Sequence, residues 1–189
     1  MKRSRSNQKD KKEHQPRKRQ NTAKQGGLKF TRPEKTDFSP LYKKHRVDMV
    51  KVGCDVDAMV AVRRKIHAHP EGGFQEVQTR QTLIDTLVGF GVESKFIKQV
   101  AKTGLIVDIC GSGKKSSSKE GKVKTVALRA DMDGLPMPEN NKSLPYVSQT
   151  SHAHMCGHDG HMACLLAAAS VLWKHRSSIP SDQKVRLLF

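Results

Sequence analysis

Apolar side chains recur at intervals of three to four residues within 55–68, 76–90 and 161–175. This spacing places them along one face of a helix. Pro70 and Gly91 follow the first two segments and are typical of the residues at which helices end. The pattern therefore predicts two amphipathic helices before the first strands and a third, strongly apolar helix near the end of the sequence.

Shorter apolar runs indicate β-strands at 93–100, 104–110 and 123–130, and a further strand opens at Lys184. The second and third runs are rich in the β-branched and aliphatic residues of a buried sheet. Residues 111–121 are polar and rich in glycine, serine and lysine, and they predict a flexible hairpin connection. Alternating helices and strands predict an α/β fold in which helices flank a central sheet.

Positive charge is concentrated at the start of the chain. The formal net charge is +17, and residues 1–51 contain 17 Lys and Arg against 5 Asp and Glu. Residues 1–38 are also poor in aliphatic side chains, so they cannot bury enough surface to offset the entropy of ordering them. We therefore divide the chain into a basic, disordered tail at 1–51 and an α/β domain at 52–189.

The tail contains the run KKEHQPRKR at 11–19, which could serve nuclear import or bind RNA, DNA or anionic lipid by charge. A solvated tail without a partner is an equally good interpretation. No apolar segment resembles a secretory signal or is long enough to span a bilayer. The cytoplasm is the default compartment, and the basic tail leaves the nucleus and the mitochondrion open.

The four cysteines show no C-x-x-C spacing and are few for the length, which argues against a disulfide scaffold. Cys54 and Cys110 are expected to be small, buried or half-buried residues. Cys156 differs, because it lies within HMCGHDGH at 154–161, where three histidines, a cysteine and an aspartate precede an apolar helix. Thiolate and neutral imidazole suit zinc and its neighbours, so Cys156 and His158 are the first candidates for metal ligands. The alternative is a histidine-rich polar loop.

Two further segments carry candidate chemistry. Asp131 and Asp133 follow a predicted buried strand, and one of them could bind metal or hold a ligand histidine in the correct tautomer. The alternative is an Asx-type turn at the strand end. His67 and His69 resemble a ligand pair, but histidines in the last turn of a helix are common and favourable to the helix dipole. We therefore interpret this pair mainly as a helix terminus. Because ligands of α/β sheets bind beyond the strand ends, the site is expected in the loops after Ala130 and before the third helix.

Together these segments resemble the aminoacylase-type metallopeptidases, specifically the amidohydrolase branch that includes hippurate hydrolase and the indole-acetyl-amino-acid hydrolases. The similarity runs from about Val56 to Phe189. It is carried by RRKIHAHPEGGFQE at 63–76, TGLIVDI at 103–109, ALRADMDGLPMPE at 127–139, LPYVSQ at 144–149 and HAHMCGHDGHMACLLAAASVL at 152–172.

The resemblance implies a zinc-peptidase-like catalytic domain with two divalent metals, zinc, manganese or cobalt, and a smaller lid and dimerisation domain. It implies hydrolysis of the amide bond of N-acyl amino acids. By residue match, Cys156 and His158 are metal ligands and Asp133 supports the catalytic centre. The roles of the neighbouring Asp131, Asp159 and His161 are less defined.

In the family the general base is a glutamate in a pair just after the strand that opens here at Lys184, and further ligands lie later still. We therefore expect the 189-residue span to be an incomplete catalytic domain, to hold metal weakly and to be inactive alone. Two alternatives stay open. One is a non-enzymatic homologue that binds RNA or another acidic partner through its tail. The other is a thiol-dependent hydrolase with Cys156 as nucleophile.

Overall fold

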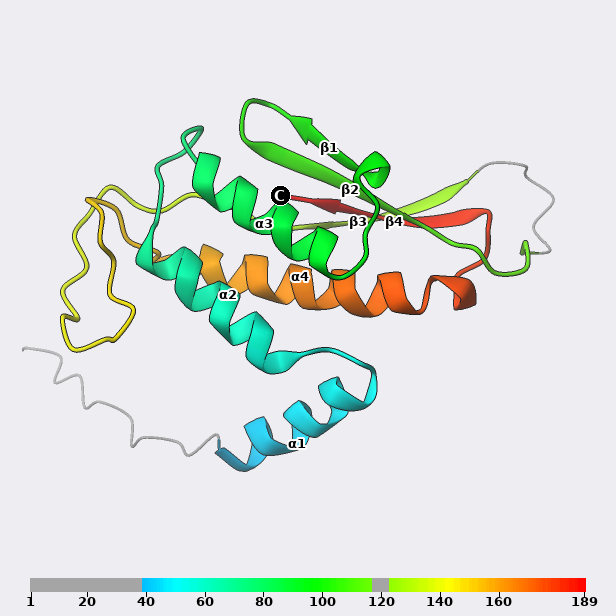
Figure 1. The fold of residues 1–189 in the computed structure, drawn as a ribbon, viewed down its shortest axis with the longest axis horizontal. Helices are drawn as coiled ribbons and strands as arrows, with labels where there is room; N and C mark the ends of the chain where they lie inside the picture. Colours follow the sequence, from blue (N-terminus) through cyan, green and yellow to red (C-terminus); the bar gives the residue numbers. More distant parts are fainter. Residues whose placement is uncertain (1–38, 117–122) are drawn as a thin grey trace, which may run out of the picture. The chain divides into compact units, whose positions relative to one another are not determined.

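The computed structural model describes residues 39–116 and 123–189. They contain one mixed sheet with the strand order β1-β2-β4-β3 (Figure 1). Its strands are β1 (Ile97–Val100), β2 (Gly104–Cys110), β3 (Lys124–Arg129) and β4 (Gln183–Leu188). β4 pairs antiparallel with β2 and parallel with β3. The parallel pair is joined through α4 (His158–Lys174), which is the kind of crossover that parallel strands require.

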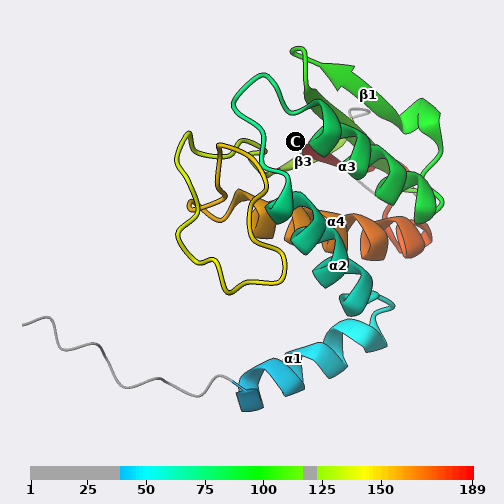
Figure 2. The same ribbon diagram turned by 60° about the vertical axis from the view of Figure 1, so that its left-hand side comes forward.

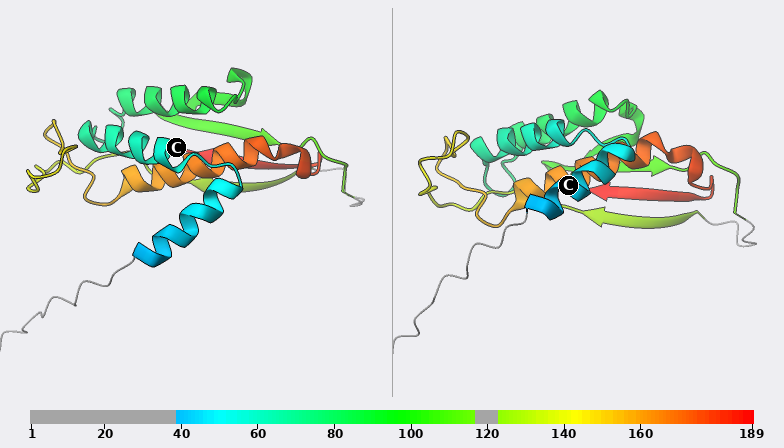
Figure 3. Two further views of the ribbon diagram at one scale, coloured as in Figure 1. Left: turned by 60° about the horizontal axis from the view of Figure 1, so that its bottom comes forward. Right: turned by 90° about the horizontal axis from the view of Figure 1, so that it is seen from below.

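Three further α-helices precede the sheet in the chain: α1 (Ser39–Lys51), α2 (Val56–Ala68) and α3 (Val77–Gly89). α3 and α4 pack against each other, α4 also contacts β2, and α2 packs along α4, so that helices cover one face of the sheet (Figures 1 and 3). Short 3-10 turns lie at Ser94–Phe96 and Arg176–Ser178. The predicted α/β class with helices on a central sheet is confirmed.

The core lies between the helices and the sheet because β2 alternates regularly. Its residues Leu105, Val107 and Ile109 are fully buried, whereas the residues between them are partly exposed. Side chains from α2, α3, α4 and β4 also contribute to the core, among them Ile66, Leu83, Leu87, Met162, Leu166 and Leu187. Each buried side chain of this kind stabilises the fold by about 1.5–3 kcal/mol relative to leaving it in water.

The loop between β3 and α4 positions the candidate chemistry. It projects beyond one end of the sheet, beside the end of α2 and the start of α4 (Figure 2). Backbone hydrogen bonds fix it there: the amide of Gln149 donates to Ala68 O, and the amide of Gly134 donates to Glu71 O. The loop also pairs with itself through Leu135 and Ala153. The segments that precede and follow the loop are thereby held at one end of the domain.

Several predicted boundaries differ from the structure. Residues 39–51, which we assigned to the basic tail, form α1, while residues 1–38 lie outside the described part. α4 begins at His158, three residues before the predicted start. Of the predicted strand 93–100, only Ile97–Val100 forms a strand, and Ser94–Phe96 form a 3-10 turn.

The predicted burial of β3 is wrong. All six of its residues are exposed, and among the described residues β3 pairs only with β4, at one edge of the sheet. The interpretation of residues 111–121 as a hairpin connection is also wrong, since β4 separates β2 from β3 in the sheet. Residues 117–122 of that connection lie outside the described part.

Candidate metal centre

Two of the predicted site residues, Asp133 and His158, lie close together. Asp133 lies in the loop that follows β3, and His158 is the first residue of α4, where that loop ends. The ring nitrogen Nδ1 of His158 lies 2.9 Å from the backbone oxygen of Asp133 and 3.0 Å from its carboxylate Oδ1. Both contacts orient one nitrogen of the ring toward oxygen acceptors, which defines Nδ1 as the protonated position. The Nε2 atom is then left as the nitrogen able to bind a cation, the arrangement common to metal-binding histidines.

Cys156, the second predicted ligand, lies two residues before His158 and is exposed. Gly157 separates them in a left-handed conformation, with φ +82°, which glycine adopts without steric cost. Within residues 39–116 and 123–189, no group of three or more His, Cys, Asp or Glu side chains converges on a point that could hold a metal ion. Cys156 and His158 therefore stay candidate ligands, and no third side chain of these types converges with them among the described residues.

The chemistry of this donor set fits a divalent metal. A thiolate and an imidazole nitrogen are ligands of zinc and of similar transition ions. The contact between Asp133 and Nδ1 supplies the outer support that such a ligand histidine needs. The residues present therefore fit one part of a metal centre.

A second group of polar residues is buried beside this centre and was not predicted. His67 faces two carboxylates: its Nδ1 lies 2.8 Å from Asp159 Oδ2, and its Nε2 lies 3.3 Å from Glu139 Oε1. Arg63 Nε also donates to Asp159 Oδ2 over 3.0 Å. His67, Glu139 and Asp159 are each less than a tenth exposed. We call these four residues the His67 cluster.

The carboxylates of the His67 cluster are held ionised. The amide of Ser148 donates to Glu139 over 2.7 Å and is the main reason that the pKa of Glu139 lies below its ordinary value, with a further contribution from His67. Burial acts to raise the pKa of Asp159, but hydrogen bonds from His67 and the Gly160 amide outweigh it and lower the pKa. Two buried negative charges thus flank one imidazole ring.

His154, within the histidine-rich segment, is buried without a hydrogen-bond partner for either ring nitrogen among the described residues. Its ring centroid lies 6.3 Å from that of His67. Burial lowers the pKa of His154, so the ring is neutral at pH 7. A neutral imidazole in this place keeps one nitrogen able to accept a proton or a cation.

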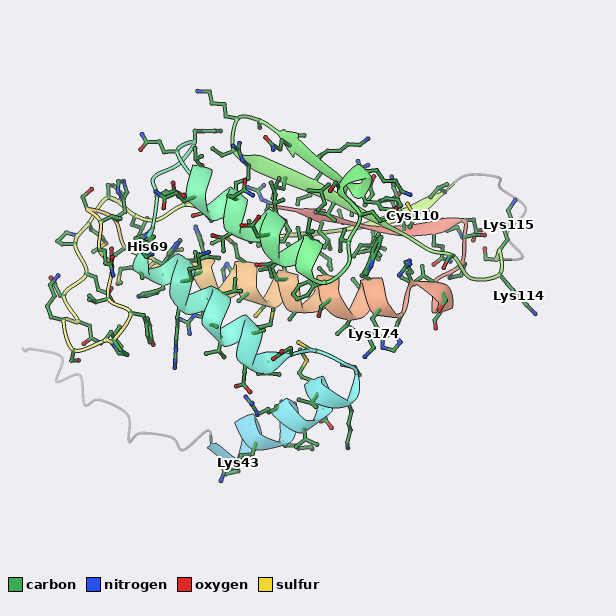
Figure 4. The ribbon with its side chains drawn as sticks, in the orientation of Figure 1. Lys43, His69, Cys110, Lys114, Lys115 and Lys174 are labelled. Carbon is green, nitrogen blue, oxygen red and sulfur yellow. The ribbon has the colours of Figure 1, made fainter. Side chains whose placement is uncertain are left out.

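The remaining sequence candidates lie away from this centre or at its rim. Asp131 is exposed and accepts hydrogen bonds from the guanidinium of Arg129. His69 is exposed at the end of α2, and its Nδ1 lies near the Lys65 carbonyl, as expected of a helix terminus. Cys110 was expected to be buried or half-buried, but it is exposed. It is the last residue of β2, in which buried and more exposed residues alternate, and it follows a buried one. It lies at the opposite end of the sheet from His69 (Figure 4). Cys54 is buried as expected.

A cleft with a volume of about 470 Å³ opens at the carboxyl end of β3 and includes residues 129–133. Residues of the segments 73–76 and 101–104 and of the end of β4 also line it. Non-glycine residues in both loops have positive φ, namely Phe74, Ala101 and Lys102. The predicted position of the site, beyond the strand ends and next to the loop after Ala130, is therefore a concave surface.

The sequence offered signals for His67 that our interpretation did not use. Arg63 and His67 are four residues apart, so both lie on one face of α2, and both contact Asp159 of the histidine-rich segment. Glu139 ends the segment ALRADMDGLPMPE at 127–139, but it lies in an irregular loop, where no periodicity indicates its partner. Within the described residues, none of the helices has the length and hydrophobicity that crossing a bilayer requires.

Solved structures of two other proteins resemble this fold. The structure of the YXEP protein of Bacillus subtilis, described as a dinuclear metal-binding peptidase of the M20 family, superimposes with a TM-score of 0.60 at 33% identity. The match covers 70% of this chain and 34% of that one. A structure of a protein described as an aminohydrolase from methicillin-resistant Staphylococcus aureus matches with a TM-score of 0.57 at 32% identity, over 69% of this chain and 30% of that one.

Residues 127–189 match the family described as peptidase family M20/M25/M40. Thermostable carboxypeptidase 1 of Saccharolobus solfataricus is 40% identical over 134 residues, which are 70% of this chain and 31% of that protein. Hippurate hydrolase of Campylobacter jejuni is 41% identical over 112 residues, 59% and 26% of the two chains. These matches support the M20 family that the resemblance implied, and the chain spans about a third of the length of these relatives.

Proposed function

We propose that this chain is part of a metal-dependent amidohydrolase that cleaves the amide bond of N-acyl amino acids. The observation that supports the proposal is the contact of His158 Nδ1 with Asp133, which leaves Nε2 of the ring to bind a metal. Cys156 would be the second ligand. Relatives with the names N-acyl-L-amino acid amidohydrolase and hippurate hydrolase support the substrate class.

A bound divalent metal polarises a carbonyl group and lowers the pKa of water, which is the chemistry that amide hydrolysis at neutral pH needs. The residues of this chain contribute support for it. Asp133 holds His158 in one tautomer and adds a negative charge that makes the ring a better ligand. The cleft beside residues 129–133 would hold the substrate close to these two side chains.

We further propose that residues 1–189 by themselves bind metal weakly and do not hydrolyse amides. The described part has two donors of the proposed centre and no third that converges with them. Hydrolysis also needs a carboxylate general base that can take a proton from water and pass it to the leaving amine. In this proposal the other ligands and the base come from family segments outside these 189 residues.

Metal content and hydrolysis, measured on the same preparations, test these proposals. The purified chain is analysed for zinc, manganese and cobalt beside a Cys156→Ser, His158→Ala double variant, and both are assayed with N-acetyl amino acids and hippurate. We expect metal in the unaltered chain, less than a tenth of it in the variant, and no hydrolysis by either. Equal metal in both would reject the two ligands. Hydrolysis that survives a chelator and is lost on alkylation would favour Cys156 as a nucleophile instead.

A second candidate function rests on charge. Residues 1–51 contain 17 Lys and Arg against 5 Asp and Glu, a density that attracts polyanions regardless of their sequence. The chain would then be a non-enzymatic M20 homologue that binds RNA through this segment. The two candidates differ in a simple way, because nucleic-acid binding would be sensitive to salt and indifferent to the double variant.

A further inference from the structure

His67 of the His67 cluster joins three separate parts of the chain. It lies in the last turn of α2, Asp159 is the second residue of α4, and Glu139 belongs to the loop between β3 and α4. Both ring nitrogens face a carboxylate, over 2.8 Å and 3.3 Å. The side chain of His67 is 9% exposed, and those of Glu139 and Asp159 are 3% and 0% exposed. An imidazole in this position has no freedom to turn without breaking a buried contact.

The contact with Asp159 fixes the first turn of α4. Asp159 directly follows His158, so any rotation of this turn that moves Asp159 also moves the His158 ring relative to Asp133. Breaking the contact would leave a buried carboxylate whose one remaining salt-bridge partner, among the residues that the structure describes, is the partly exposed Arg63. Buried charges that lose a partner are costly, typically by several kcal/mol, so the turn would shift to recover hydrogen bonds.

We propose that His67 is a positioning residue that holds the start of α4 in the orientation in which Cys156 and His158 bind metal together. This inference rests on the proposed function. It goes beyond it by assigning a role to a residue that contacts neither proposed ligand. A merely structural His67 would stabilise the whole domain equally and leave the relative affinity for metal unchanged.

His69 provides a matched control. It lies two residues after His67 at the same helix end, is exposed, and its ring contacts only the Lys65 carbonyl of its own helix among the described hydrogen bonds. The full 189-residue chain is compared with its His67→Gln and His69→Gln variants. Glutamine keeps a polar group of similar length but cannot face both carboxylates at once.

Two readouts separate positioning from stability. Titration with Co²⁺, followed by the thiolate-to-cobalt absorption band, measures affinity at Cys156. Amide hydrogen exchange compares residues 161–163 near the start of α4 with residues 171–174 at its end. We expect His67→Gln to weaken Co²⁺ binding about 10-fold and to speed exchange only near the start of α4. His69→Gln should change neither readout.

The outcomes are distinguishable. Unchanged cobalt affinity and exchange in His67→Gln would overturn the inference, and so would faster exchange along all of α4, which indicates a general structural role. If the unaltered chain binds no Co²⁺, the proposed metal function fails, and exchange near the start of α4 alone decides whether His67 fixes that turn. If His67→Gln does not fold, the milder variant Glu139→Gln decides. It removes the charge that faces Nε2 of His67 and so holds the ring less firmly, while the Asp159 contact stays in place. It must show a smaller change of the same kind, or the inference is rejected.

Discussion

Asp133 differs from Asp131, two residues earlier, in what its carboxylate reaches. Asp133 accepts from the ring of His158, whereas Asp131 accepts from the exposed guanidinium of Arg129. A carboxylate beside Nδ1 makes the opposite nitrogen more basic, and removal of such outer support typically costs 10- to 100-fold in metal affinity. The two aspartates of one short motif therefore have different consequences for binding.

We predict that Asp133→Asn weakens Co²⁺ or Zn²⁺ binding by about 10-fold, because the amide oxygen can still accept from Nδ1 but carries no charge. Competition with a chromophoric chelator measures the affinity. Asp131→Asn is the control and should leave the affinity unchanged. A larger effect from Asp131 than from Asp133 would mean that the tautomer of His158 is not controlled in the way we propose.

At the scale of single residues, the sequence predicted several residues of the candidate site but not all of the partners that they contact. Asp133 and His158 could be proposed because both lie in dense, chemically distinctive motifs. His67 was not assigned, because a histidine in the last turn of a helix is also explained by the helix dipole. Its two carboxylate partners lie 72 and 92 residues away along the chain. Only the tertiary structure reveals that they are neighbours.

At the scale of elements, the periodicity of apolar residues predicted which helices and strands form better than it predicted how buried they are or which strands are neighbours. β2 occupies the predicted residues 104–110, and α2 and α3 agree with prediction within one residue at each end. The exposure of β3 could not be predicted, since β-branched and aliphatic residues form edge strands as well as central ones. Neither could the position of β4 between β2 and β3, because strand order depends on long-range pairing rather than on local pattern.

The pair of strands β2 and β4 carries an ion cluster on the face away from the core side chains of β2. Asp108 accepts from Arg186 over 2.7 and 2.8 Å and from Lys184 over 3.1 Å. These hydrogen bonds, that of Arg186 above all, lower the pKa of Asp108 to about 2. Because the pKa in the folded chain lies below its unfolded value, Asp108 stabilises the fold above about pH 4 and loses this contribution as the pH falls toward 2.

We therefore predict that Asp108→Asn reduces the dependence of stability on acid. Between pH 6 and pH 2 the unaltered chain should lose about 1 kcal/mol more than the variant, a figure that allows for solvent screening of a partly exposed cluster. Urea unfolding at both pH values measures the difference. Asp85→Asn, which removes a carboxylate that accepts from the neutral amide of Gln81, is the control and should keep the full acid dependence.

At the scale of the whole molecule, charge and chemistry occupy different parts of the chain. The candidate metal centre and the His67 cluster lie within residues 38–189, which form a compact unit of their own. Most of the net charge of +17 lies outside that unit, since residues 1–37 contain 13 Lys and Arg against 4 Asp and Glu. The two candidate functions can therefore be removed separately by changes at different places.

Removal of the basic segment tests the second function without disturbing the first. We predict that deletion of residues 1–37 lowers the affinity for single-stranded RNA at least 10-fold at low salt and leaves metal binding unchanged. A milder variant replaces the five cations of residues 11–19 by glutamine and should reduce the slope of log affinity against log salt by up to about 3.5, near 0.7 for each lost phosphate contact. Fluorescence anisotropy at several salt concentrations measures both. An affinity for RNA that persists after the deletion, with the same salt slope, would assign the binding to the α/β unit and leave the basic segment without this role.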